Sequence, residues 1–454
     1  MLNDRGPTVR RPKAPDSVLS RSVMGTAARV GLIGIAVANS VLVARALGPA
    51  GLGQFYLFAQ VVAVLAVVAD GGLSNSAAAF FGRDSAALPY LHGLLLRILP
   101  LSAIATATVG GVALAALHGT VLPNVSYGLL WIAFGTLPFA LYCNVCFNML
   151  AGLGRIREAS VAQLVGGTTW LGLTSLFVAL FDGGVAVAAG VYGASLVMQA
   201  VVMVRMAVRI VGPPRTTAPA EGLARAFTSF ALRAFPGAVA HLLLLRLPAF
   251  LLNVFHGPAA VGIFSAAQQL AEKSCLPAVA VQSAAYSGMS NRARDAATSA
   301  VNRFVRFCWW GMTAVVVVGM ALAGPVVHLL LGARYDAAAP LLRVLLPGVL
   351  FSACALVLDT YFLNQLRRPG LLSILSVVQV AIVAGLGVLL IPHFAAPGAA
   401  TSLALAQILG VLAYACWHLR ASDSTLSDLV VLNDADRQAF RDHTGLLLSR
   451  RRDG

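Results

Sequence analysis

Long apolar segments dominate this chain and restrict the folds that are open to it. Each is about 20 residues or longer, the length that an α-helix needs to cross the hydrocarbon core of a bilayer. Because lipid cannot satisfy backbone polar groups, a spanning element must be a helix or a strand of a closed barrel. The segments lack the alternation of barrel strands. They therefore predict an all-α integral membrane protein.

The composition agrees with this fold class. The 454 residues are 59% hydrophobic and 11% charged, whereas soluble domains carry roughly 25% charged residues. We predict about twelve transmembrane helices in two six-helix bundles. The predicted spans are approximately 22–46, 53–80, 88–117, 124–150, 158–181, 184–206, 232–255, 258–288, 303–323, 339–365, 371–392 and 397–419.

The polar stretches divide the chain around these spans. Residues 1–21 are basic and proline-containing, which is typical of a cytoplasmic tail. The N-terminal bundle is predicted at 22–206, a cytoplasmic inter-bundle linker at 207–231 and the C-terminal bundle at 232–420. Residues 421–454 form a second cytoplasmic tail, which is either a weak amphipathic helix on the inner leaflet or a solvated, frayed segment.

The distribution of positive charge predicts the orientation. Of the 32 lysines and arginines, 25 fall in the two tails and in the connections after even-numbered spans. Cytoplasmic segments of membrane proteins carry this excess, so we expect a multi-pass protein with both termini in the cytoplasm. The net charge of +15 then indicates contact with anionic membrane lipids rather than with nucleic acid.

A repeat relates the two halves. The segment 48–55, GPAGLGQF, matches 257–264, GPAAVGIF, at five of eight positions. Both copies lie between the first and second span of a six-span half. Six is an even number, so the halves enter the membrane in the same orientation, as in the parallel repeats of many secondary transporters. A tight turn explains the glycines and prolines themselves.

Polar side chains cluster on one face of a span in each half. In the first span they fall within about 60° of arc, and they are Ser22, Thr26, Arg29 and Ser40. In the eighth span they are Ser265, Gln268, Gln269, Glu272 and Ser283. Two such stripes in opposite halves predict a water-filled lumen between the bundles.

Charged groups inside the spans are the candidate functional residues. A charge near the bilayer centre costs roughly 2.5–3.5 kcal/mol, so it usually faces a cavity or a partner. In the functional interpretation, Arg29 and Arg246 attract an anionic substrate group, and Glu272 or His241 takes up a coupling proton. In the structural alternative, Arg246 and Glu272 neutralise each other as a buried pair.

Signatures of catalysis or cofactor binding are missing from the sequence. There is no Gly-Lys-Ser/Thr nucleotide loop and no cluster with metal-ligand spacing. The Cys143-x-x-Cys146 pair lies inside an apolar span with no second ligand pair, so two small buried side chains are expected there. We predict no enzyme, no metal and no cofactor.

Several stretches carry a family resemblance. They are ARALGP at 44–49 with Gly51, Gly53 and Tyr56, ADGGLS at 69–74, GIFSAA at 262–267, and LGARY at 331–335 with Ala338 and Pro340. The chain resembles, from about residue 20 to 420, polysaccharide-biosynthesis flippases of the multidrug/oligosaccharidyl-lipid/polysaccharide exporter superfamily.

The resemblance implies two six-helix bundles around a cationic cavity. It further implies flipping of a polyprenyl-pyrophosphate-linked oligosaccharide from the inner to the outer leaflet of a bacterial inner membrane, with polysaccharide polymerase and export machinery as further partners. Arg29 and Arg246 would meet the pyrophosphate, with Ser22, Thr26, Gln268 and Gln269 lining the cavity. Two alternatives stay open, a multidrug/cation antiporter of the same superfamily and a membrane glycan polymerase or ligase.

Overall fold

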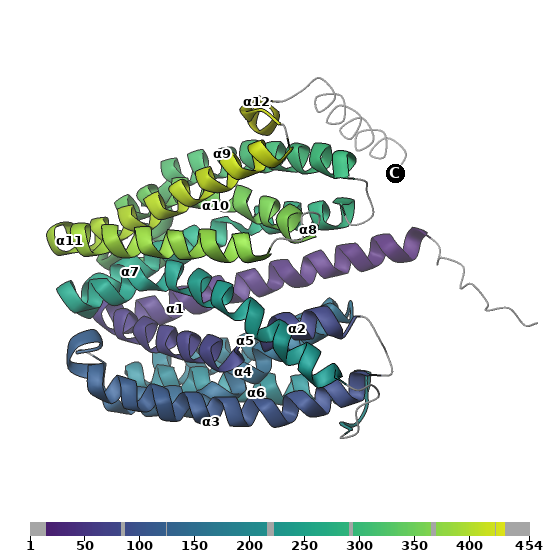
Figure 1. The fold of residues 1–454 in the computed structure, drawn as a ribbon. Coiled ribbons are helices and arrows are strands. Elements are labelled where there is room, and N and C mark those ends of the chain that lie inside the picture. Colours follow the sequence, from purple (N-terminus) through teal and green to yellow (C-terminus); the bar gives the residue numbers. More distant parts are fainter. Residues whose placement is uncertain are drawn as a thin grey trace, which may run out of the picture.

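The computed structural model describes residues 15–82, 87–123, 125–215, 222–289, 294–364, 369–422 and 424–431, and these form helices and the turns between them (Figure 1). The first half contains α1 (Pro15–Asp70), α2 (Leu73–Phe80), α3 (Leu88–Val121), α4 (Tyr127–Gly152), α5 (Ile156–Thr174), the π-helical turn η1 (Ser175–Leu180) and α6 (Val185–Val211). The second half contains α7 (Leu223–Ser274), α8 (Leu276–Met289), α9 (Arg294–Leu331), the short η2 (Ala333–Tyr335), α10 (Ala338–Asn364), α11 (Pro369–Ser422) and α12 (Leu426–Val430).

Twelve spans follow from nine long apolar helices. Nine helical stretches among the described residues are long and apolar enough to cross a membrane. Three of them, in α1, α7 and α11, contain a break at Gly48, Gly257 and Ala395. At each break the chain leaves helical geometry, and each of these stretches supplies two spans. The prediction of an all-α membrane protein with about twelve spans in two bundles is confirmed.

The breaks at Gly48 and Gly257 have a local cause. Both glycines have a positive φ, 66° and 77°, which a residue without Cβ adopts without strain. Each is followed by a proline, which has no backbone N–H to continue a helix. The repeated Gly-Pro pair therefore ends one span and begins the next. We call the end of the molecule that carries these two turns the turn end.

The helices form two bundles that meet along α1 and α7. In the first bundle, α1 packs against α4 and α5; in the second, α7 packs against α10 and α11. Figure 1 shows α1 running between the dark first bundle and the green and yellow second bundle. The second span within α7 lies against the first span within α1, where Ser40 bonds to Gln269 and Lys273.

The chain segment that links the two bundles is more helical than the sequence suggested. Within the predicted linker 207–231, α6 continues to Val211 and α7 already begins at Leu223. The first turns of α7 contact α2: the Ser76 hydroxyl donates to the Phe227 carbonyl at 2.8 Å, and the rings of Phe80 and Phe227 lie 5.6 Å apart. Long-range packing extends this helix beyond its apolar segment.

The cysteine pair on α4 behaves as expected of small side chains. Cys143 and Cys146 are both buried. Among the described residues, no group of three or more histidine, cysteine, aspartate or glutamate side chains could hold a metal ion.

The C-terminal segment docks on α9 through the five-residue helix α12. The Arg306 guanidinium donates to the Asp428 carbonyl, and the Trp310 indole N–H donates to the Val430 carbonyl at 2.8 Å. The Asp428 carboxylate accepts the Thr425 backbone N–H at 2.8 Å and the Thr425 hydroxyl at 2.7 Å. A short helix is present where the tail begins, and residues 432–454 lie outside the described residues.

We predict that the stability of α12 depends on the charge of Asp428. The hydrogen bonds from the backbone and side chain of Thr425 lower the pKa of Asp428 below its usual value. A lowered carboxyl pKa stabilises the folded segment above the unfolded pKa of about 4, and this stabilisation is lost as the pH falls through the folded pKa. Asp428→Asn should therefore speed amide hydrogen exchange of α12 at pH 7 and have a smaller effect at pH 3, where part of the stabilisation is already lost. Equal exchange in both proteins at pH 7 would contradict this role.

Candidate functional site

Two pairs of polar side chains in the second half of α7 define the candidate site. Gln268 and Glu272 are four residues apart, and so are Gln269 and Lys273. Residues at this spacing lie on the same side of a helix. The two pairs therefore lie about 100° apart around the helix axis and serve two neighbouring but separate environments.

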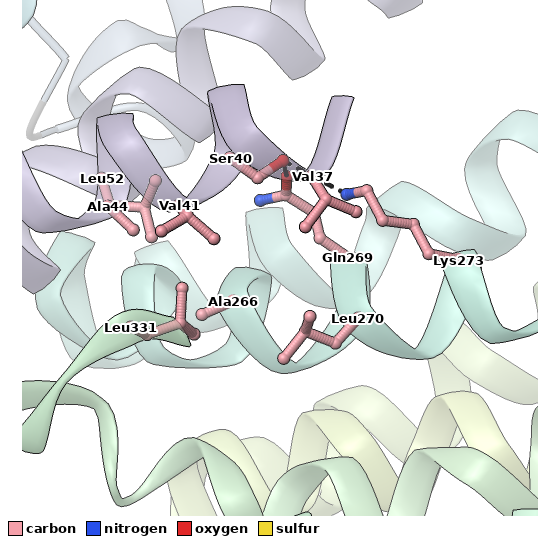
Figure 2. Close-up of a pocket in the computed structure, with 10 residues that line it drawn as sticks. All are labelled: Val37, Ser40, Val41, Ala44, Leu52, Ala266, Gln269, Leu270, Lys273 and Leu331. Atoms are coloured by element: carbon pink, nitrogen blue, oxygen red, sulfur yellow. Dashed lines mark hydrogen bonds between the residues drawn. The ribbon is translucent and has the colours of Figure 1, made fainter. Parts of the chain in front are cut away.

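The first environment is a narrow pocket between the bundles (Figure 2), which we call the inter-bundle pocket. Its lining comes from both halves and consists of Val37, Ser40, Val41, Ala44, Leu52, Ala266, Gln269, Leu270, Lys273 and Leu331. Three of these ten side chains are polar, and Lys273 is the only charged one. The pocket has a volume of about 10 Å³, room for about one water molecule.

The polar side chains of the pocket are bonded to one another across the interface. The Lys273 ammonium donates to the Ser40 hydroxyl at 3.2 Å, and the Ser40 hydroxyl donates to the Gln269 Oε1 at 3.0 Å (Figure 2). Ser40 also lies 2.8 Å from the Ala36 carbonyl of its own helix. Ser40 belongs to α1, so one hydroxyl of the first bundle links two side chains of the second.

The second environment is a network that we call the bridging network, made by Tyr56, Arg246, Gln268 and Glu272. Arg246 donates to the Tyr56 hydroxyl at 3.1 Å and to Glu272 at 3.2 Å. Tyr56 donates to the Gln268 Oε1 at 3.0 Å, and the Gln268 amide donates to Glu272 at 2.9 Å. Tyr56 lies in α1 and the other three in α7, so this network also crosses between the bundles.

The charges of the two environments differ in how they are compensated. Arg246 and Glu272 form an ion pair, with side chains 21% and 37% exposed. Lys273 contacts a hydroxyl, and among the described residues no carboxylate lies within ion-pair distance of it. The hydrogen bond of Lys273 thus goes to an uncharged group, while the adjacent Glu272 carboxylate acts on it only through space and is bonded to Arg246, so the ammonium keeps donors for an anionic ligand.

The structure separates the residues that the sequence grouped together. Gln269 lines the inter-bundle pocket, whereas Arg246, Gln268 and Glu272 form the bridging network. His241 is exposed on α7 and lines neither. The side chains of the remaining predicted residues lie outside the described ones, and these are Ser22, Thr26 and Arg29.

Sequence reasoning did not assign a ligand role to Lys273. It lies next to Glu272 in the sequence, which suggests mutual neutralisation, but the Glu272 carboxylate is bonded to Arg246. The signal that could have found it is its spacing of four from Gln269, which places it on the pocket side of the helix.

Comparison with known proteins assigns the family. The sequence pattern of the family described as polysaccharide biosynthesis protein matches residues 23–286, more than half of the chain. The chain belongs to the polysaccharide biosynthesis protein family. The family resemblance seen in the sequence motifs is confirmed. No curated protein sequence matches the chain.

Solved structures with the same fold include MOP superfamily transporters and a lipid II flippase. An inward-facing multidrug resistance MATE family transporter of the MOP superfamily has a TM-score of 0.68 and 17% identity, over 86% of this chain and 94% of that one. The lipid II flippase MurJ in its inward closed conformation has a TM-score of 0.67 and 13% identity, over 90% and 89%. A MOP superfamily transporter from Pyrococcus furiosus has a TM-score of 0.63 and 17% identity, over 88% and 95%. At these identities the likeness establishes the fold.

Proposed function

We propose that this protein flips a polyprenyl-pyrophosphate-linked oligosaccharide across the bacterial inner membrane, from the inner to the outer leaflet, for polysaccharide biosynthesis. The family match and the two-bundle fold support a transporter or flippase in general. The observation that supports the anionic, lipid-linked substrate is Lys273, a cation in a pocket between the two bundles whose hydrogen bond goes to a hydroxyl and not to a carboxylate.

The pocket provides chemistry suited to a pyrophosphate. An ammonium donates up to three hydrogen bonds and favours phosphate oxygens. Ser40 and Gln269 add a hydroxyl and an amide beside it. These groups would replace part of the water shell that the pyrophosphate loses when it leaves the leaflet surface. The apolar side chains of the pocket would contact the rest of the substrate.

The described conformation is closed around this site. A volume of about 10 Å³ holds about one water molecule, far less than a pyrophosphate group. The bundles must therefore separate for the substrate to enter, and the bonds of Ser40 with Gln269 and Lys273 must break when they do. The proposed cycle is alternating access, in which one bundle rocks against the other.

Glu272 is the group best placed to couple this motion to a proton. Its carboxylate accepts from both Arg246 and Gln268. A proton on Glu272 would remove the charge that holds Arg246, and Arg246 would then be free to reorient with Tyr56. Among the described residues His241 makes no hydrogen bond to this network, although it lies within electrostatic range of Arg246 and Glu272, so we assign the coupling role to Glu272 before His241.

The proposal is tested with purified protein in proteoliposomes. We expect a fluorescent polyprenyl-pyrophosphate oligosaccharide to move between leaflets only when the protein is present, and more quickly with a pH gradient. A neutral glycolipid of the same tail length should not move. Export of cationic dyes without movement of the glycolipid would reject the proposal and favour a multidrug/cation antiporter.

A further inference from the structure

The two Gly-Pro turns pack directly against each other at the turn end. Each turn has the same spacing, a Gly-Pro pair followed by a glycine four residues after the proline: Gly48, Pro49 and Gly53 in α1, and Gly257, Pro258 and Gly262 in α7. The turn geometry needs the first glycine of each set. It places no demand on Gly53 or Gly262, which lie inside the helices that follow.

The contacts of Gly53 and Gly262 explain these glycines. A methyl group added at Gly53 would overlap the Pro258 carbonyl oxygen and lie 2.9 Å from the Gly262 nitrogen. A methyl group added at Gly262 would overlap the Pro49 carbonyl oxygen and lie 3.1 Å from the Gly53 nitrogen. The atoms in the way are backbone atoms, which cannot rotate aside as a side chain can.

This contact is reciprocal. Gly53 faces the turn of the second half, and Gly262 faces the turn of the first half in the same manner. Such a self-complementary patch has the symmetry of a two-fold contact between like partners. Small residues let two helices approach to backbone distance. Here each repeat supplies the small residue for the other repeat.

Hydrogen bonds from two side chains lie beside the glycine contact and also join the two bundles. The Arg45 guanidinium donates to the carbonyls of Leu330 at 2.8 Å and Leu329 at 2.6 Å, at the C-terminal end of α9. The Tyr335 hydroxyl donates to the Ala44 carbonyl at 2.9 Å. Two side chains thus tie the first turn to the second bundle, beyond the glycine contact.

We propose that the two turns form a seal that closes the space between the bundles at the turn end, and that Gly53 and Gly262 determine how closely it shuts. The inference goes beyond the proposed function, because it concerns the closed state of the chain and holds for any cargo. It also gives the repeat a purpose that a simple re-entry turn lacks, since a re-entry turn needs no glycine at 53 or 262.

The seal predicts a measurable opening when either glycine gains a methyl group. Spin labels would be placed at Phe181→Cys in the first bundle and Leu329→Cys in the second, whose side chains are 71% and 74% exposed. The exposed Cys416 would be replaced by serine in every variant. We expect Gly53→Ala and Gly262→Ala each to shift the distance distribution between the labels to longer values.

Matched controls come from glycines in open space. A methyl group at Gly34 in α1 or at Gly385 in α11 would meet nothing within 4 Å. Gly34→Ala and Gly385→Ala should therefore leave the distribution unchanged. The same distribution in Gly53→Ala or Gly262→Ala as in the parent protein would overturn the proposal.

A gentler variant tests the seal itself if the alanine variants do not fold. Tyr335→Phe removes one hydroxyl and its bond to the Ala44 carbonyl without adding an atom to the glycine contact. We expect part of the distance distribution of Tyr335→Phe to shift to the longer values. A distribution identical to that of the parent would show that this end of the molecule is not held shut by these contacts. The measurement needs no substrate, so it stands or falls separately from the flipping assay.

Discussion

Lys273→Gln is expected to lower transport of a pyrophosphate-linked glycolipid by roughly 10- to 100-fold, the equivalent of a lost charged hydrogen bond of about 1.5–3 kcal/mol. Glutamine retains a donor toward Ser40 but not the charge that faces the pocket. The measurement is the initial flipping rate in proteoliposomes at equal protein content.

Two companions separate charge from packing at this position. Lys273→Arg retains the charge and should keep most of the activity. Gln269→Leu removes one polar partner of Ser40 and no charge, so it should have a smaller effect than Lys273→Gln. Wild-type rates in Lys273→Gln would show that the pocket cation does not contact the substrate.

Arg246→Ala should destabilise the protein, and adding Glu272→Gln to the same chain should restore most of the lost stability. The single change leaves the Glu272 carboxylate without its cation. Breaking a fully buried pair costs about 3–5 kcal/mol; here Glu272 is 37% exposed, so partial solvation reduces the expected cost to about 1–3 kcal/mol. The measurement is thermal unfolding in detergent.

Transport by the same variants distinguishes a structural pair from a working one. If the pair only stabilises the fold, the double variant Arg246→Ala with Glu272→Gln should recover transport along with stability. If Glu272 carries the coupling proton, the double variant should be stable yet lose its response to a pH gradient. Unchanged stability in Arg246→Ala would show that the bridging network contributes nothing to the fold.

The fold was predictable because each span is long and apolar in its own right. The boundaries between spans were predictable where a helix breaker is present, as at Gly48 and Gly257, or at the break near Ala395 between two prolines. The start of α7 at Leu223 was not, because its first turns are held by Phe227 against α2. Such packing leaves no periodic signal in the local sequence.

The candidate site was predictable in part. A polar stripe on the eighth span indicated Gln268, Gln269 and Glu272; the two glutamines bond to the first bundle, and Glu272 bonds to Gln268 and Arg246 beside them. The sequence did not predict that Gln269 faces the pocket while Gln268 and Glu272 face the bridging network. That division depends on the positions of Ser40 and Tyr56 in the other bundle. The sequence left open whether Arg246 pairs with Glu272; the structure pairs them.

The contact between the two turns was likewise not predictable from the repeat. The sequence predicted two equivalent turns from residues 48–55 and 257–264. It did not predict that Gly53 faces Pro258 while Gly262 faces Pro49. The relative placement of two halves is a property of the tertiary structure, and equal motifs alone do not show that they touch.

Photocrosslinking from within the inter-bundle pocket tests the central claim most directly. A benzophenone amino acid would replace Leu270, which lines the pocket, or Leu101, which is 68% exposed on the outer face of α3. With the polyprenyl-pyrophosphate oligosaccharide present, irradiation should yield a glycan-bearing adduct at position 270, and excess inorganic pyrophosphate should reduce it. Adducts at 101 alone, or equal adducts that pyrophosphate does not reduce, would contradict a substrate path between the two bundles.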